Sequence, residues 1–277
     1  MSALTREAPG RAGGSTAGRI AAMVLRHLYL LRTSWPRIFE LMYWPTIQMI
    51  LWGFITKFLL ENSSYVAQAS GVLIAAVLLW DVLFRGQLGV SLSFLEEVWS
   101  RNLGNLAVSP LTPREFLGAM MTMSLIRTLI GVLPATGLAV VFWQFSIYSL
   151  GVPLVAFFSL LIVFGWAIGM AVSALILRAG QGAESVAWLA IFLIAPVSAI
   201  YYPVGILPAW LQPVGWALPT VPVFEGMRTI LLEGTVRLDL LAHAVALDAL
   251  YLGLGAGLFL LSFRVARKRG LLLQIGE

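Results

Sequence analysis

Residues 150–177 form an unbroken stretch of 28 positions without an Asp, Glu, Lys or Arg. A helix needs about 20 apolar residues to cross the hydrocarbon core of a bilayer. Inside that core every backbone polar group must be hydrogen-bonded within the protein, so only helices and closed barrels can span it. Because a barrel strand takes only about 10 residues, the length of this stretch favours a helix. The chain is therefore expected to fold around membrane-spanning helices.

Similar apolar segments recur along the 277 residues. Hydrophobic residues make up 60% of the chain and charged residues only 11%, against roughly a quarter charged in soluble domains. We predict an all-α polytopic membrane protein with one six-span transmembrane domain over residues 37–264. The predicted spans are residues 38–60, 66–90, 116–142, 150–177, 185–202 and 240–263. This composition excludes a soluble enzyme, a disordered chain and a disulfide-stapled secreted domain.

The fifth span is followed by a broken segment. Forty uncharged residues separate Glu184 from Glu225, too many for one span and too few for two with a loop. Prolines recur in the second half of this stretch, and proline interrupts a straight helix. We therefore predict a re-entrant helical hairpin over residues 203–232, on the outer side of the membrane. Non-helical backbone is tolerated there only where it is buried in protein or faces water.

Two polar ends flank the spans. Residues 1–18 are rich in Gly, Ala and Ser and are predicted to be a disordered cytosolic tail, and residues 265–277 a basic cytosolic tail. Residues 19–36 are expected to form an amphipathic helix that lies at the membrane interface, capped by Ser15 or Thr16. Arg19 and Arg26 fall opposite its apolar arc. The arc comprises Ile20, Val24, Leu28, Leu31 and Trp35. The alternative is a solvated helix packed on a partner.

The basic residues predict the orientation. With the N-terminus inside, inner segments carry 14 of the 18 Lys and Arg residues and outer segments carry 3. Such an excess is typical of the cytoplasmic side, so both termini are expected in the cytoplasm. Only Lys57 and Lys268 are lysines, and this arginine bias indicates a bacterial protein. We predict a multi-pass protein of the bacterial cytoplasmic (inner) membrane.

The connection over residues 91–115 is the longest inner segment between spans. Thr112 with Pro113 and Glu115 has the spacing of a capping box with proline at the first helical position. The connection is either a simple linker or a docking helix that contacts a soluble partner. The candidate docking residues are Glu96, Glu97, Arg101, Asn102, Ser109, Pro110, Thr112 and Arg114.

A few ionisable residues fall inside the predicted spans. A lone charge at the bilayer centre costs about 3 kcal/mol or more, so we predict that Asp81 and Arg127 form an ion pair. The pair either holds two spans together or forms part of a transport pathway. Asp248 and His243 lie five residues apart in the last span. They suggest either a proton relay or two polar residues satisfied by other partners.

Two further patterns concern helix packing and the outer hairpin. Glycines four apart, at 165/169 and 253/257, suit close helix contacts. The hairpin region is rich in aromatic residues, which form either an interfacial belt or a lid over the exit. The candidate hairpin residues are Tyr201, Tyr202, Trp210, Trp216, Glu225 and Arg228, beside Phe224.

Three segments together resemble the ABC-2 type permeases. Residues 108–118 read Val-Ser-Pro-Leu-Thr-Pro-Arg-Glu-Phe-Leu-Gly, similar to the family's Ser-Pro-Leu-x-Pro-x-Glu segment. Residues 202–219 resemble the family's outer segment with Leu-Pro-x-Trp-Leu-Gln, and residues 224–228, Phe-Glu-Gly-Met-Arg, resemble the motif that follows it. With the basic ending at 263–269, the resemblance covers about residues 20–270. It includes the drug-resistance, nodulation-factor and polysaccharide exporter branches without separating them.

The resemblance implies a fold and a set of partners. The fold has six spans, an interfacial helix before the first, a coupling helix between the second and third, and an outer re-entrant pair before the sixth. The permease would dimerise, with a homodimer expected, and bind two cytosolic ABC ATPase subunits through the candidate docking residues. ATP and Mg would be held by those subunits, and no cofactor by this chain. Membrane lipids are further partners, and nucleic acid is not expected.

The residues fit an ATPase supplied by another chain. The sequence contains no Gly-x-x-x-x-Gly-Lys-Ser/Thr, the motif that cradles nucleotide phosphates. It has no cysteine and only two distant histidines, so metal catalysis is not expected. No catalytic cluster is recognisable, and we predict a permease rather than an enzyme. It would export an amphipathic, lipid-like, glycan or drug-like substrate; the alternative is a proton-coupled secondary transporter that uses Asp81, Arg127 and Asp248.

Overall fold

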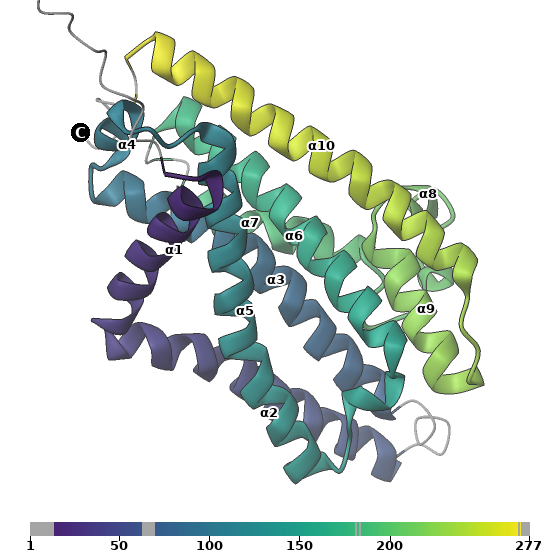
Figure 1. Ribbon diagram of the computed structural model, residues 1–277. Helices are drawn as coiled ribbons and strands as arrows, with labels where there is room; N and C mark the ends of the chain where they lie inside the picture. The colour runs from purple at the N-terminus through teal and green to yellow at the C-terminus, as the bar shows by residue number, and fades with distance from the viewer. Residues whose placement is uncertain (1–13, 63–69, 181, 183, 271, 273–277) are drawn as a thin grey trace, which may run out of the picture.

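The computed structural model describes residues 14–62, 70–180, 182, 184–270 and 272. The described residues form helices and no strands (Figure 1), in agreement with the predicted all-α class. The long helices are α2 (Trp35–Asn62), α3 (Ser70–Trp99), α5 (Pro113–Trp143), α6 (Val152–Ala179) and α10 (Leu238–Lys268). In length and composition these five could each cross a membrane. The chain is thus a polytopic membrane protein.

The shorter elements lie before, between and after these helices. The short α-helices are α1 (Thr16–Arg32), α4 (Leu103–Val108), α7 (Glu184–Ile194), α8 (Gln212–Trp216) and α9 (Thr220–Glu233). Within the described residues, 3-10 turns cover Ile147–Leu150, Ala195–Val197 and Val204–Ile206. Most of the predicted N-terminal tail and the last residues of the C-terminal tail lie outside the described residues.

Helix α3 forms the centre of the bundle. It packs against α5 on one side and α6 on another, while α6 also packs against α10 (Figure 1). Gly165 and Gly169 of α6 make the close approach possible. A Cβ atom at Gly165 would lie 2.7 Å from the Leu83 carbonyl oxygen, and one at Gly169 2.7 Å from that of Gln87. The predicted contact role of Gly165 and Gly169 is confirmed.

The corresponding prediction for α10 is wrong. Among the described residues, no atom lies within 4 Å of a Cβ atom placed at Gly253 or Gly257, whereas a Cβ atom at Gly255 would lie 2.5 Å from the Ala167 carbonyl oxygen. Gly255 lies on the helix face turned to α6, and its two neighbours at 253 and 257 are rotated away from that face. The small residue that permits close packing of α10 is therefore Gly255.

The two larger buried clusters divide the core along the bundle. One joins α1, α4, the start of α5 and the end of α10, through residues such as Val24, Leu103, Phe116 and Phe263. The other joins the opposite parts of α3, α5 and α6 to α9. The first cluster places α1 and the end of α10 at the same end of the bundle (Figure 1). An even number of membrane crossings would also place the two ends of the chain on the same side of the membrane.

The fifth predicted span differs from expectation. In place of a helix over 185–202, α7 ends at Ile194 and continues only as the turn Ala195–Val197. Eleven helical residues extend about 16 Å, roughly half of the hydrocarbon core. Pro196 removes a backbone donor at this point, and Ala199 adopts a left-handed conformation with φ 53°. The described chain thus has five full-length spans, and the count of six stays a prediction.

The broken segment that follows is present. A 3-10 turn, α8 and α9 replace the continuous helix over residues 203–232. Helix α9 packs beside α10 (Figure 1). Prolines at 203, 208, 213, 219 and 222 occupy turns and helix starts, where a missing backbone donor is tolerated.

Candidate functional site

Helix α1 is joined to the end of α3 by a buried carboxylate. The Glu97 side chain is fully buried, and its Oε1 accepts from Arg26 Nε at 3.1 Å. Its Oε2 accepts from Asn102 Nδ2 at 2.5 Å, and His27 Nε2 lies 3.4 Å from Oε1. Because α3 continues to Trp99, Glu97 is directed toward α1 rather than into a flexible loop. Glu97 therefore holds α1 in place and presents no surface to a soluble partner.

The charge pairs between α3 and α5 differ from the predicted ones. Arg127 Nη2 donates to both carboxylate oxygens of Glu96, at 2.9 and 2.8 Å. Asp81 instead accepts from Arg85 Nε at 2.6 Å, one turn along the same helix. The predicted Asp81–Arg127 pair is therefore wrong. The i,i+4 spacing of Asp81 and Arg85 could have indicated the local partner, since such pairs meet without any tertiary contact.

The start of α5 has the predicted cap and a further partner. Glu115 N donates to Thr112 Oγ1 at 3.3 Å and Thr112 N donates to Glu115 Oε2 at 2.8 Å, which confirms the capping box. Arg19 Nη2 also donates to Glu115 Oε1 at 2.5 Å. This hydrogen bond raises the pKa of the Arg19 guanidinium above its usual value. Ser15, as predicted, caps α1 by accepting from Gly18 N at 3.1 Å.

Helix α1 packs on the bundle through a largely apolar face that two arginines flank. Its buried residues are Met23, Val24, His27 and Leu31, and Arg19 and Arg26 face α5 and α3. Trp35 belongs to α2 and is 74% exposed. Of the expected apolar arc, Val24 and Leu31 are buried, and Ile20 and Leu28 pack against the same core cluster. The arginines differ from expectation, because they reach acidic partners on the bundle.

The α3–α5 connection exposes only part of the candidate docking set. We define the connection surface as Arg101, Val108, Pro110 and Arg114, which are all exposed. Ser109 is turned inward, where its Oγ donates to the Leu106 carbonyl oxygen at 2.8 Å. A pocket of about 250 Å³ lies beside this surface. It is lined by Arg19, Ala22, Met23, Leu106, Ser109, Pro110 and Leu111.

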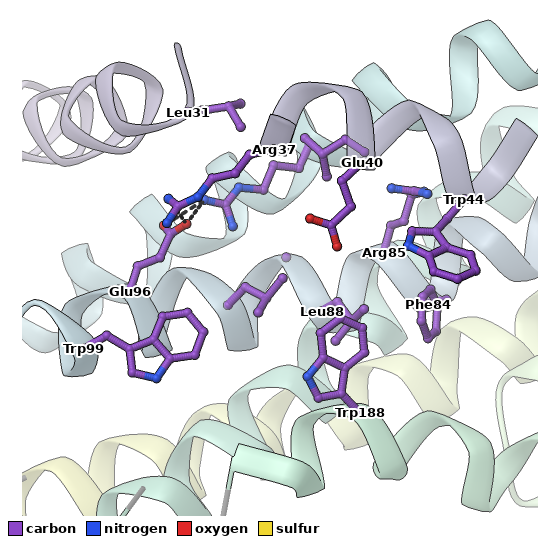
Figure 2. Close-up of a pocket in the computed structure, with 14 residues that line it drawn as sticks. Leu31, Arg37, Glu40, Trp44, Phe84, Arg85, Leu88, Glu96, Trp99 and Trp188 are labelled. Carbon is purple, nitrogen blue, oxygen red and sulfur yellow. Dashed lines mark hydrogen bonds and ion pairs between the residues drawn. The ribbon is translucent and has the colours of Figure 1, made fainter. Parts of the chain in front are cut away.

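A larger cavity of about 270 Å³ lies between α2, α3, α5 and α7 (Figure 2). It contains both charged and aromatic side chains. The charged ones are Arg37, Glu40, Arg85, Glu96 and Arg127. The aromatic ones are Trp44, Phe84, Trp99 and Trp188. Sequence reasoning missed this cavity, since its residues are up to 157 positions apart and share no motif.

The outer segment is held by a second set of polar contacts. Arg228 of α9 donates to the carbonyl oxygens of Ala199 and Ile200, the latter at 2.8 Å. Glu225, 3.4 Å from Arg228, accepts from Val204 N at 2.6 Å. These two predicted hairpin residues therefore cap backbone groups that the break after α7 leaves without helical partners.

The aromatic residues of this segment divide into packed and exposed ones. Tyr201 stacks on Trp52 of α2 with ring centroids 4.5 Å apart. Tyr202 Oη donates to the Pro196 carbonyl oxygen at 2.5 Å. Trp216 stacks on His243 at 6.0 Å, whereas Trp210 is 76% exposed.

Asp248 stands apart from the other predicted charges. It is 4% exposed, and neither carboxylate oxygen has a hydrogen-bond partner among the described residues. His243 is exposed and stacks on Trp216, so the two do not form a contact that could relay a proton. The structure therefore does not bring Asp81, Arg127 and Asp248 into one polar pathway.

Comparison with known families assigns the chain. The profile of the ABC-2 type transporter family matches residues 28–232, from α1 to the end of α9. A comparison with curated proteins found no match. Five span-length helices and the exposed α3–α5 connection agree with a membrane permease. Since the family profile covers well over half of the sequence, the chain belongs to the ABC-2 type transporter family and is a permease of an ABC-type transporter.

Proposed function

We propose that this permease is the membrane subunit of an ATP-driven exporter. A separate cytosolic ABC ATPase, in two copies, would supply ATP and Mg, and two copies of the permease would form the pathway. The protein would lie in a bacterial inner membrane with both termini in the cytoplasm. The transported compound would be amphipathic: lipid-like, glycan or drug-like.

The observation that carries the proposal is the attachment of the connection surface to the core. Helix α4 lies between the ends of α3 and α5, and Leu103 is buried in the same cluster as Val24 and Phe116. The Glu97–Arg26 and Glu115–Arg19 contacts tie both helix ends to α1. A force applied at Val108 or Arg101 would therefore reach α1, α3 and α5 together. Coupling to a soluble ATPase requires such a rigid connection between the docking surface and the membrane helices.

The ion pairs argue against the proton-coupled alternative. Asp81 is paired with Arg85 and Arg127 with Glu96, so neither is a free carrier of protons between the two sides. Asp248 is isolated from both. Proton transfer along a chain requires neighbouring groups that exchange hydrogen bonds.

Co-expression with the ABC ATPase encoded nearest to this gene tests the proposal. We expect a stable complex and ATP-dependent export from inverted vesicles. Arg101→Glu together with Val108→Asp should lower ATPase binding and abolish export, while Arg237→Gln, on the exposed linker before α10, should change neither. Transport that proceeds on a proton gradient without any ATPase would refute the proposal.

A further inference from the structure

The cavity between α2, α3, α5 and α7 has aromatic walls that the bundle leaves uncovered. Trp44 is 54% exposed and Trp188 43% exposed. Gln87 Nε2 donates to the Ala187 carbonyl oxygen at 2.9 Å, which holds α7 against α3 and places Trp188 beside Leu88 (Figure 2). Large aromatic surfaces in a cavity are suited to contact with a ligand rather than with the core.

The arginines in this cavity already have acidic partners. Arg127 is bound by both oxygens of Glu96, and Arg85 by Asp81. Arg37, at the rim, lies 3.5 Å from the same Glu96 carboxylate. Arg85 and Arg127 are thus each paired with a carboxylate inside the cavity, and Arg37 lies at its rim.

Glu40 is the exception among the acids. Within the described part of the chain it has no hydrogen-bond or ion-pair partner. Figure 2 shows its carboxylate directed into the cavity, with Trp44 on the same helix to one side and Leu88 and Trp188 opposite. Arg37, one turn away on α2, is turned to Glu96 instead. Glu40 is exposed, and it therefore presents to the cavity a carboxylate that no arginine neutralises by direct contact.

A carboxylate among indole rings selects a particular ligand chemistry. The faces of tryptophan rings attract cations, and organic ammonium groups are bound in such surroundings. An anion would meet repulsion from Glu40, and Arg85 and Arg127 each already have a carboxylate partner. Apolar residues of the same cavity, Leu31, Leu41, Leu88 and Leu92, offer a surface for an alkyl chain.

We propose that this cavity binds the ammonium head of a cationic amphiphile, with Glu40 as its counter-ion and Trp44 and Trp188 as its aromatic walls. This names the substrate class and rests on the proposed export function. On α2 the lining residues Glu40 and Trp44 are next in sequence to Phe39 and Tyr43, which with Ile47 form an exposed apolar face. An alkyl tail could follow that face while the head stays in the cavity.

The test compares two amphiphiles with the same tail and opposite charge, dodecyltrimethylammonium and dodecyl sulfate. The full chain is reconstituted in phosphatidylcholine nanodiscs, and binding is measured by equilibrium dialysis far below the micelle concentrations, with empty discs subtracted. We expect dodecyltrimethylammonium to bind with the lower Kd. Glu40→Gln should raise that Kd about tenfold, and Glu40→Lys should reverse the preference between the two probes. Glu233→Gln, an exposed acid at the end of α9, is the matched control.

Trp188 provides a second variant, which leaves Glu40 unchanged. Trp188→Leu should weaken dodecyltrimethylammonium binding several-fold and leave dodecyl sulfate unaffected. Tighter binding of dodecyl sulfate by the wild type, no binding of either probe, or an unchanged Kd in Glu40→Gln would each overturn the inference. ATPase association is measured separately on the same variants. A wild type that binds the ATPase but shows no preference for dodecyltrimethylammonium would refute this inference alone. A wild type that shows the preference but binds no ATPase would refute only the proposed function.

Discussion

The Arg127 guanidinium on α5 lies 2.8 Å from a carboxylate oxygen of Glu96 on α3, and both side chains are largely buried. The pair fixes α5 against the last turns of α3, next to the attachment of α1 through Glu97. Glu96 and Arg127 also line the cavity between α2, α3, α5 and α7. The Glu96 carboxylate therefore both holds α3 against α5 and lies in the candidate ligand site.

Removing Arg127 is expected to destabilise the protein. Arg127→Met leaves the Glu96 carboxylate without its main counter-ion, and breaking a buried ion pair costs about 3 kcal/mol. The melting temperature in detergent should fall accordingly. Adding Glu96→Gln should restore part of the loss, whereas adding Asp81→Asn should not. Rescue by Asp81→Asn would instead favour an Asp81–Arg127 pair.

Glu97 and Arg101 are close in sequence but should behave differently. Glu97→Gln removes the charge that binds Arg26, so amide hydrogen exchange in α1 should accelerate and stability should fall by about 2 kcal/mol. Arg101→Glu, on the connection surface, should stay within about 0.5 kcal/mol of the wild type and weaken only the ATPase complex. Equal destabilisation by both substitutions would contradict the assignment of Glu97 to holding α1 and of Arg101 to the connection surface.

The glycines of α6 and α10 make a matched pair of tests. Gly169→Ala places a Cβ atom against the Gln87 carbonyl oxygen of α3 and should cost about 1–3 kcal/mol through overpacking. Gly257→Ala has open space within the described chain and should leave the melting temperature nearly unchanged. The comparison is made by thermal unfolding of both variants in the same detergent.

Arg228 should control the order of the outer segment. Arg228→Gln removes the hydrogen bonds to the Ala199 and Ile200 carbonyl oxygens, and bonds to a charged donor stabilise by about 1.5–3 kcal/mol. Because the chain has no cysteine, a single Val204→Cys reports on this region by maleimide labelling. Labelling of this buried position should accelerate roughly tenfold in the Arg228→Gln background. Arg237→Gln, which breaks only an exposed pair with Asp239, should have no effect. Equal labelling rates in the wild type and both variants would show that Arg228 does not order this segment.

The predicted orientation is tested in the same way. Thr235→Cys, between α9 and α10, should be labelled in intact cells by a membrane-impermeant maleimide. Val108→Cys, 88% exposed on α4, should be labelled only after the membrane is permeabilised. The reverse pattern would invert the assignment of both termini to the cytoplasm.

Patterns that depend on neighbours in the chain could be predicted from the sequence. Apolar segments long enough to span a bilayer indicated the helices, because backbone groups in lipid must bond within their own segment. The Thr112–Glu115 capping box and the cap at Ser15 follow from spacing within one helical turn. The clustered prolines indicated the break after α7, since proline removes a donor wherever it occurs.

Contacts between distant segments were decided only by the tertiary structure. Arg127 has several acids within reach of α5 in principle, and only the packing of α3 against α5 selects Glu96. Helix α1 carries its arginines toward the bundle because Glu97 and Glu115 lie there, which periodicity in α1 cannot reveal. The unpaired state of Glu40 likewise depends on where Arg37, Arg85 and Arg127 find their partners. Charge pairing across helices depends on distances of a few ångströms, and those distances exist only once the helices have packed.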